Sequence, residues 1–180
     1  MKKKIGILAL FALLCVFGAK AQLTTSMKLN EVLVVNEDNF VDDYGKRHPW
    51  IELFNNSAGT VDLRGCYLTN DKNNPKKYMI PKGDVLTKVP PRQHILFWAD
   101  NEPSSGTFHT NFTLNPDANN WIGLYDSGRN LLDQVVIPAG SLQTNQSYAR
   151  VSDAAEKWEV KDGSAEKYVT PSTNNKTIDS

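Results

Sequence analysis

The feature that most constrains the fold is a succession of short β-rich runs, none of which keeps a helical period for more than about two turns. Gly, Pro, Asn and Asp separate these runs, and no internal repeat relates them. Many short strands at this spacing indicate an all-β fold, either a β-sandwich or a barrel. We predict strands within residues 28–36, 50–55, 60–70, 77–81, 93–100, 120–126, 131–138 and 147–151, with a weaker edge strand at 158–160.

The run "WIELFN" (50–55) indicates how such strands are buried. Because side chains alternate along a strand, Ile51 and Leu53 share one face and Trp50, Glu52 and Phe54 share the other. Both faces carry apolar groups, so we expect one face to be covered and the other to be partly covered. Between two later runs, "DSGRN" (126–130) places a glycine in a tight connection, which predicts a hairpin.

The first 21 residues have the pattern of a secretory signal peptide. Lysines at 2–4 precede an uncharged apolar stretch at 5–18, and small residues at 19 and 21 fit cleavage before Gln22. The apolar stretch is shorter than the roughly 20 residues of a membrane span. Lipidation of Cys15 is a weaker alternative, because a bulky leucine precedes it. We therefore expect export to the periplasm or the cell surface, with no direct membrane span.

Charge and cysteine content restrict the chain that follows. Four of the 20 basic residues lie in the first 21 positions, which leaves 16 bases against 20 acids and a net charge of −4. Such a chain lacks the basic cluster that binds nucleic acid or an anionic membrane. Cys66 is the only cysteine left, so no intramolecular disulfide forms and a hydrophobic core must supply the stability. Its strand-like context favours a small buried hydrophobe over a catalytic nucleophile.

Sequence motifs along nearly the whole chain resemble the lamin-tail domain, an immunoglobulin-like β-sandwich found in nuclear lamins and in many exported bacterial proteins. The signature is a W-I-E-L-x-N strand, a turn and a V-D-L-x-G-x-x-L strand, and order and spacing make the resemblance specific. The matching segments are "LNEVLV", "PWIELFNNSAGTVDLRGCYLTND", "IPKGDVL", "PPRQHILFWAD", "FHTNFTLNPDANNWIGLYDSGRNLLDQVVIP", "SYARVSDAAEKWEV" and "TPSTNN".

The resemblance implies one domain, which we place at residues 28–160. A signal peptide at 1–21 and a short segment at 22–27 precede it, and a polar tail at 161–180 follows. Two positions depart from the family pattern. Cys66 stands where an aromatic residue is frequent, which suggests a slightly repacked core, and Ser172 stands where a glycine often follows the last proline. The family has no shared active site and consists of interaction or structural modules.

The densest group of polar residues is "NEDNFVDDYGKRHPWIE" (36–52). Asp38, Asp42 and Asp43 could supply oxygen ligands to Ca²⁺, together with the glutamates at 37 and 52, although the EF-hand spacing is absent. The alternative is a turn in which the acids bond to their own backbone and Gly45 takes an unusual dihedral angle. We favour the turn.

The same stretch is the candidate binding site. Tyr44 and Trp50 are predicted to be exposed aromatic contacts beside Asp42 and Asp43, since exposed aromatics are typical of binding hot spots. We predict no catalytic residue. The histidines at 48, 94 and 109 are far apart in the sequence and do not form a zinc motif, and the resemblance implies that the last of them is an ordinary part of the fold.

We therefore expect an exported, non-catalytic binding or structural accessory module. It would recognise another envelope protein, or a membrane assembly with a periplasmic face, through its loops or through a sheet edge that adds a strand. The alternative is a calcium-dependent carbohydrate-binding or adhesion module, and an enzyme is the third hypothesis. No cofactor other than calcium is expected.

Overall fold

The computed structural model describes residues 24–163 and 169–175, and in them the chain is all-β with three antiparallel sheets. Two short 3₁₀ helices, η1 (Val85–Thr87) and η2 (Pro103–Ser105), accompany the strands. The predicted signal peptide at 1–21, with its cleavage site and Cys15, lies outside the described residues. Among those residues, no helix has the length and apolar character to cross a membrane.

The larger sheet has five strands in the order β11-β10-β1-β2-β7. They are β1 (Met27–Leu33), β2 (Trp50–Asn55), β7 (His94–Trp98), β10 (Ser147–Arg150) and β11 (Trp158–Lys161). The four-stranded sheet has the order β5-β4-β8-β9, and a small third sheet pairs β3 with β6. These strands are β3 (Val61–Asp62), β4 (Tyr67–Thr69), β5 (Tyr78–Met79), β6 (Lys88–Val89), β8 (Asn120–Tyr125) and β9 (Leu131–Ile137).

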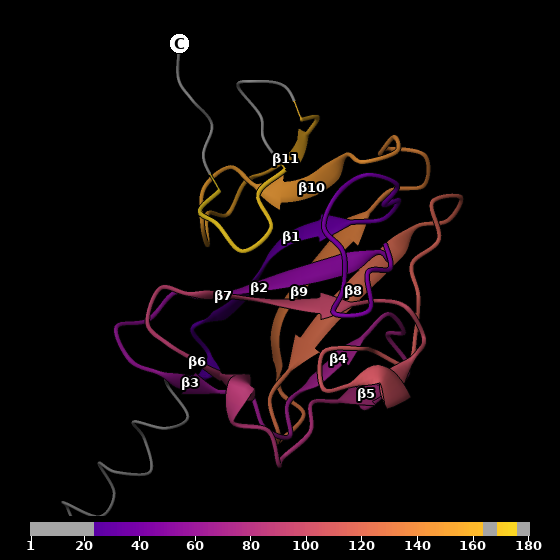
Figure 1. The fold of residues 1–180 in the computed structure, drawn as a ribbon. Coiled ribbons are helices and arrows are strands. Elements are labelled where there is room, and N and C mark those ends of the chain that lie inside the picture. The colour runs from indigo at the N-terminus through magenta and orange to yellow at the C-terminus, as the bar shows by residue number, and fades with distance from the viewer. Residues whose placement is uncertain (1–23, 164–168, 176–180) are drawn as a thin grey trace, which may run out of the picture.

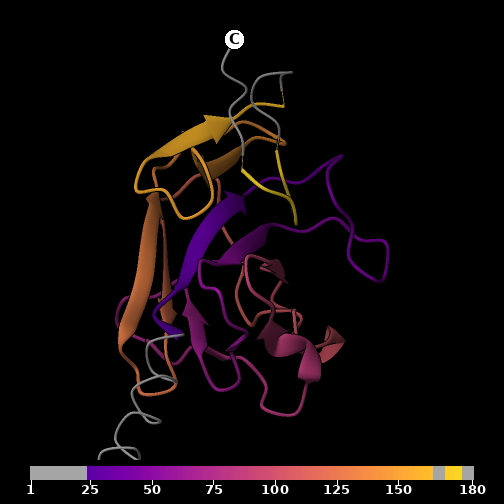
Figure 2. The same ribbon diagram turned by 90° about the vertical axis from the view of Figure 1, so that its left-hand side faces the viewer.

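The two larger sheets form the layers of a sandwich. Figure 1 shows β8 and β9 crossing the direction of β2 and β7, and the quarter turn of Figure 2 separates the two layers. The main hydrophobic core takes residues from both sheets, among them Leu29, Ile51 and Leu53 from the larger and Ile122 and Leu124 from the smaller. Burial of these alternating side chains is what holds the sheets together.

A β-bulge in β1 decides which side chains of that strand reach the core. Leu29 pairs with Leu53 but Glu31 pairs with Glu52, so Asn30 is an extra residue on β1. The alternation shifts there by one position, and Asn30 and Glu31 both lie on the face of the sheet that points away from the main core. The bulge therefore brings two polar side chains together on this outer face.

Most strand predictions agree with the structure, but the run 60–70 divides into β3 and β4 of different sheets, and β6 was not predicted. The predicted strand at 50–55 coincides with β2, and a hairpin at 126–130 joins β8 to β9 as expected. The positive dihedral angle of that hairpin belongs to Arg129 (φ 73°), which follows the glycine. Cys66 is buried in the main core as predicted, and burial raises the pKa of its thiol to about 11.

The outer face of β2 and the end of the chain differ from expectation. The side chains of Trp50, Glu52 and Phe54 are all buried, where partial cover was expected. Residues 169–175, which fall within the predicted polar tail, lie against the outer face of the larger sheet and bury Thr170 and Asn175. We call residues 169–175 the C-terminal cover.

We expect Leu53→Ala to lower the free energy of unfolding by about 2–5 kcal/mol, because it opens a cavity in the main core. Leu131→Ala is the matched control, since that leucine is 45% exposed, and its effect is expected to stay within about 0.5 kcal/mol. Urea denaturation of both variants measures the difference. Equal losses for the two variants would contradict this assignment of the core.

Candidate functional site

The acidic loop, residues 36–48, is held in shape by the turn that the sequence predicts. Asp42 Oδ1 accepts hydrogen bonds from the backbone N–H groups of Tyr44 (2.9 Å) and Lys46 (2.8 Å). Gly45 has φ 74° and its N–H donates to the Asp42 carbonyl at 3.0 Å. Asp42 is consequently buried, so its primary role is to build the loop rather than to contact a partner.

The structure does not bring the three predicted calcium ligands together. The backbone N–H of Asp38 donates to Asn145 Oδ1 at 3.1 Å, which holds this residue against a distant loop. Asp43 is exposed beside a surface pocket, whereas Asp42 turns inward. Within the described residues, the acid and histidine groups close enough to share an ion include Asp42 but neither Asp38 nor Asp43.

Of the two predicted aromatic contacts, Tyr44 is exposed and Trp50 is not. Tyr44 is 62% exposed, and its hydroxyl donates to the Ser105 carbonyl at 2.9 Å. The prediction of an exposed Trp50 is wrong, because this residue is fully buried on the outer face of the larger sheet. It forms a small cluster there with Leu33 and Trp98, against which Val169 of the C-terminal cover packs.

A pocket of about 350 Å³ opens beside the acidic loop. The loop itself, η1 and the segment 105–109 supply most of its wall, and Leu96 and Trp98 of β7 supply the rest. Polar and apolar groups line it in similar measure. The pocket is large enough to receive a small ligand or a side chain of a partner.

Large exposed hydrophobic side chains gather at this pocket. Phe40, Val41 and Leu86 line it with exposures of 47%, 44% and 65%. Val85 adjoins Leu86, and Tyr44 bonds to a residue of the pocket wall. These are five of the eight large hydrophobic residues that are exposed in the described part of the chain. We call Phe40, Val41, Tyr44, Val85 and Leu86 the apolar rim.

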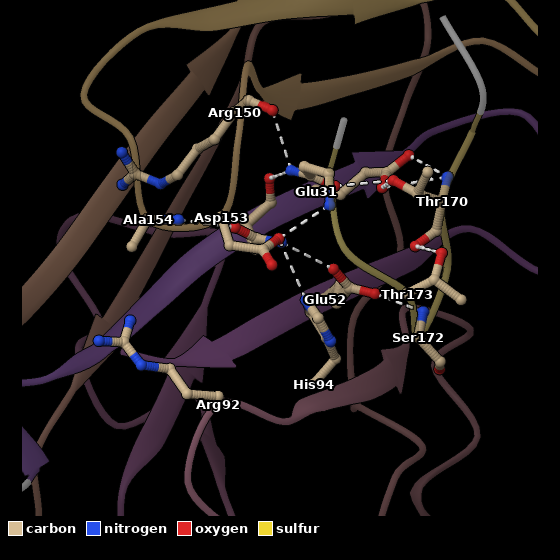
Figure 3. Close-up of polar contacts among 12 residues, drawn as sticks. Glu31, Glu52, Arg92, His94, Arg150, Asp153, Ala154, Thr170, Ser172 and Thr173 are labelled. Carbon is tan, nitrogen blue, oxygen red and sulfur yellow. Dashed lines mark hydrogen bonds and ion pairs between the residues drawn. The ribbon is translucent and has the colours of Figure 1, made fainter. Parts of the chain in front are cut away.

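On the outer face of the larger sheet, the bulge places two carboxylic acids beside each other. Glu31 of β1 and Glu52 of β2 are partners across the paired strands, and both are fully buried. Asn30 Nδ2 donates to Glu52 Oε1 and to Asp153 Oδ1, each at 3.0 Å. Figure 3 shows the two glutamates directed toward the C-terminal cover, with His94 below them.

The C-terminal cover supplies the remaining hydrogen bonds of this pair. Thr170 donates to Glu31 through its N–H (3.1 Å to Oε1) and lies with its hydroxyl 2.6 Å from Oε2. The N–H of Ser172, at φ 61°, donates to Glu52 Oε2 at 2.5 Å (Figure 3). Asn175 Nδ2 donates to the carbonyls of Asn30 (3.1 Å) and Arg150 (2.9 Å). The C-terminal cover thus gives hydrogen-bond partners to polar groups that would otherwise be buried without them.

Burial raises the pKa of both carboxyls, that of Glu52 more strongly, with the charge of Glu31 as its second cause. Two buried acids so close together titrate as a pair that shares a proton. Burial and charge alone would favour the proton on Glu52, but the hydrogen bonds of the pair favour Glu31, and these fix the position of a proton more directly.

The shared proton belongs on Glu31. The Thr170 hydroxyl lies 2.6 Å from Glu31 Oε2 and 2.7 Å from Asn175 Oδ1, yet it has a single proton to donate. The amide orientation of Asn175 is fixed, since its Nδ2 already serves two carbonyls. A protonated Glu31 donates to Thr170, which then donates to Asn175. Glu52 instead meets a donor on each oxygen, as a carboxylate requires.

Sequence reasoning missed the residues of this network. It placed Glu52 on a partly covered strand face and named it as a possible calcium ligand, and it did not single out Asn30 or Glu31. The signal available was the polar pair "NE" inside an apolar strand, at the position where a bulge turns two consecutive side chains to one face. Its partners in the C-terminal cover are 120 and 139 residues away, and no local pattern connects them.

Glutamine at the two positions is expected to have opposite effects. Glu31→Gln keeps an acceptor for Ser147 and a donor for Thr170, so the free energy of unfolding near pH 5 stays within about 0.5 kcal/mol of wild type. Glu52→Gln turns an N–H₂ group toward Asn30 or Ser172, which are donors, and costs about 1–3 kcal/mol. Urea denaturation of both variants measures this. Equal losses of stability in the two variants would contradict the assignment of the proton to Glu31.

The raised pKa values also predict a dependence of stability on pH. Above the ordinary value of 4.5 the folded pair binds more protons than the unfolded chain, so its contribution is complete below 4.5 and is lost as the pH rises. We expect Glu31→Gln, which removes one titrating group, to become more stable relative to wild type between about pH 5 and pH 8. A constant difference over that range would show that the pair is ionised throughout.

Comparison with known proteins agrees with this architecture. A search of curated proteins gave no match. A family model, described as Lamin Tail Domain, matches residues 22–139, a range that runs from before β1 to the end of β9. This family consists of non-enzymatic immunoglobulin-like domains for which a protein-binding role is suggested. Because the matched residues make up well over half of the 180, the chain belongs to the lamin tail domain family.

Proposed function

We propose that this lamin tail domain is an exported, non-catalytic module that docks another envelope protein on the apolar rim. The observation that carries the proposal is the concentration of exposed hydrophobic side chains around one pocket. Clustered exposed apolar surface is costly in water and is typical of interaction sites, whereas single exposed residues need no explanation. Export is supported by the signal-peptide pattern of residues 1–21.

The wall of the pocket indicates the chemistry of the partner. Asp43 and Asp84 line it beside Phe40 and Leu86. The Leu86 N–H donates to Asp84 Oδ1 at 2.8 Å and holds the pKa of this acid below its ordinary value, so the charge persists at neutral pH. An apolar side chain flanked by lysine or arginine on the partner would therefore complement the site.

Docking on the loops is better supported than the addition of a partner strand to the edge strand β7. The Trp98 N–H donates to the Phe108 carbonyl (2.7 Å) and the Thr110 N–H donates to the Trp98 carbonyl (2.8 Å), so the segment 108–110 already occupies part of this edge. A partner strand would have to displace these bonds, whereas the apolar rim is open.

Calcium-dependent carbohydrate binding receives less support than protein docking. It would use the acidic loop, with three aspartates as ligands, and the aromatic residues beside it. Trp50 is buried, and Asp38 and Asp43 lie outside the groups of side chains that could share an ion.

The test is capture of a partner after cross-linking in the native cells, read by mass spectrometry. We expect the Phe40→Ser/Leu86→Ser variant to lose an envelope protein that the wild type captures, with recovery reduced at least about tenfold, equivalent to about 1.4 kcal/mol. Both side chains are exposed, so the fold is expected to survive, and thermal unfolding verifies this.

The matched control is Leu131→Ser/Val136→Ser, which removes hydrophobic side chains of 45% and 47% exposure from β9, outside the pocket wall. This variant is expected to capture the partner as the wild type does. Equal loss in both variants would indicate non-specific adhesion of apolar surface, and equal retention would place the interface elsewhere. Either result would contradict docking on the apolar rim.

A further inference from the structure

Two histidines and three acids converge beneath the acidic loop. Asp42, Asp100 and His109 offer donor atoms that all lie within 4.8 Å of one another, and so do His48, Asp100 and Glu102. Asp100, directly after β7, belongs to both groups. The side chains of Asp42 and Asp100 are 1% and 0% exposed, so the shared centre of the two groups is shielded from water.

The side chains of Asp42 and His48 face each other at a separation that suits two ligands of one ion. Asp42 uses Oδ1 for backbone bonds and turns Oδ2 toward His48 Nε2, at 3.6 Å. This separation is too long for a hydrogen bond, and the buried Nε2 has no other partner. Two ligands about 2.1 Å from a tetrahedral ion are about 3.4 Å apart, so the separation of this histidine–aspartate pair also suits two ligands of one cation.

Asp100 is the residue that both groups share, and hydrogen bonds hold its two carboxylate oxygens. Its Oδ1 accepts the Glu102 N–H at 3.0 Å, and its Oδ2 lies 2.5 Å from His109 Nδ1, which fixes the carboxylate in place. Glu102 is a weaker candidate, because it is 42% exposed on its side chain and pairs with Lys46 at 3.1 Å. Asp42 and His48 therefore face each other, each has a donor atom within 4.8 Å of one on Asp100, and His109 is hydrogen-bonded to Asp100.

We propose that Asp42, His48 and Asp100 bind one divalent transition-metal ion of the zinc class, and that His109 positions Asp100. Mixed imidazole and carboxylate ligands suit such ions, whereas Ca²⁺ takes six to eight oxygens. Three acids against one nearby lysine leave a negative site that attracts a cation. A carboxylate held by a second residue is the usual support of a metal ligand. The site goes beyond protein docking and does not depend on it.

The test is titration of the purified, metal-free protein with ZnCl₂ and, separately, with CaCl₂, followed by calorimetry and thermal unfolding. We expect one equivalent of Zn²⁺ to bind and to raise the Tm, since a ligand of the folded state stabilises it. His48→Ala is expected to weaken binding at least about tenfold. Its side chain is 19% exposed and its Nε2 has no hydrogen-bond partner, so its removal leaves the fold intact.

Asp43→Asn is the matched control, because it removes a neighbouring acid that belongs to neither group. It is expected to bind Zn²⁺ as the wild type does. In the wild type, Zn²⁺ is expected to shift the ring ¹⁵N resonance of His48. Absence of Zn²⁺ binding, or binding that His48→Ala leaves unchanged, would overturn the proposal. Preference for Ca²⁺ would do so as well.

Discussion

The pairing of Glu31 with Glu52 is the constraint on which the outer face of the larger sheet depends. Two acids opposite each other on paired strands repel, and burying both is costly unless a proton is shared and every oxygen has a partner. The strands supply only part of these partners, through the side chains of Asn30 and Ser147. The C-terminal cover brings Thr170 to Glu31 and Ser172 to Glu52, across 139 and 120 residues of sequence. Residues 169–175 therefore complete the hydrogen bonding of the first two strands.

This closure also determines which surfaces remain for function. With Val169 packed on the cluster of Leu33, Trp50 and Trp98, the face that would resemble an aromatic binding platform is part of the interior. The opposite face of the sheet carries the main core. The acidic loop and η1 remain open and present the apolar rim. This agrees with the protein-binding role suggested for the family, since loops on a rigid scaffold commonly carry binding residues.

Much of the fold was predictable because it depends on the local alternation of apolar side chains and on turn residues. Ile51 and Leu53 on one face of β2, the hairpin before β9 and the Asx-type turn at Asp42 all follow from neighbours within a few positions. The burial of Trp50 was not predictable, since the segment that covers it comes from beyond residue 168. The two histidines His48 and His109 were treated as distant because contacts between segments far apart in the sequence leave no local pattern. The folded chain nevertheless brings each within 4.8 Å of donor atoms on Asp100.

The two proposed sites share residues, and this has a thermodynamic consequence. Asp42 and His109 line the pocket beneath the apolar rim and also belong to the cluster around Asp100. A cation there would offset the negative charge of the pocket, where Asp43 and Asp84 favour a basic partner, and it would fix the loop that carries Phe40 and Tyr44. The first effect weakens docking and the second strengthens it by reducing the ordering entropy that binding must overcome. Whichever effect is larger, linkage requires the partner to change the affinity for the ion by the same factor.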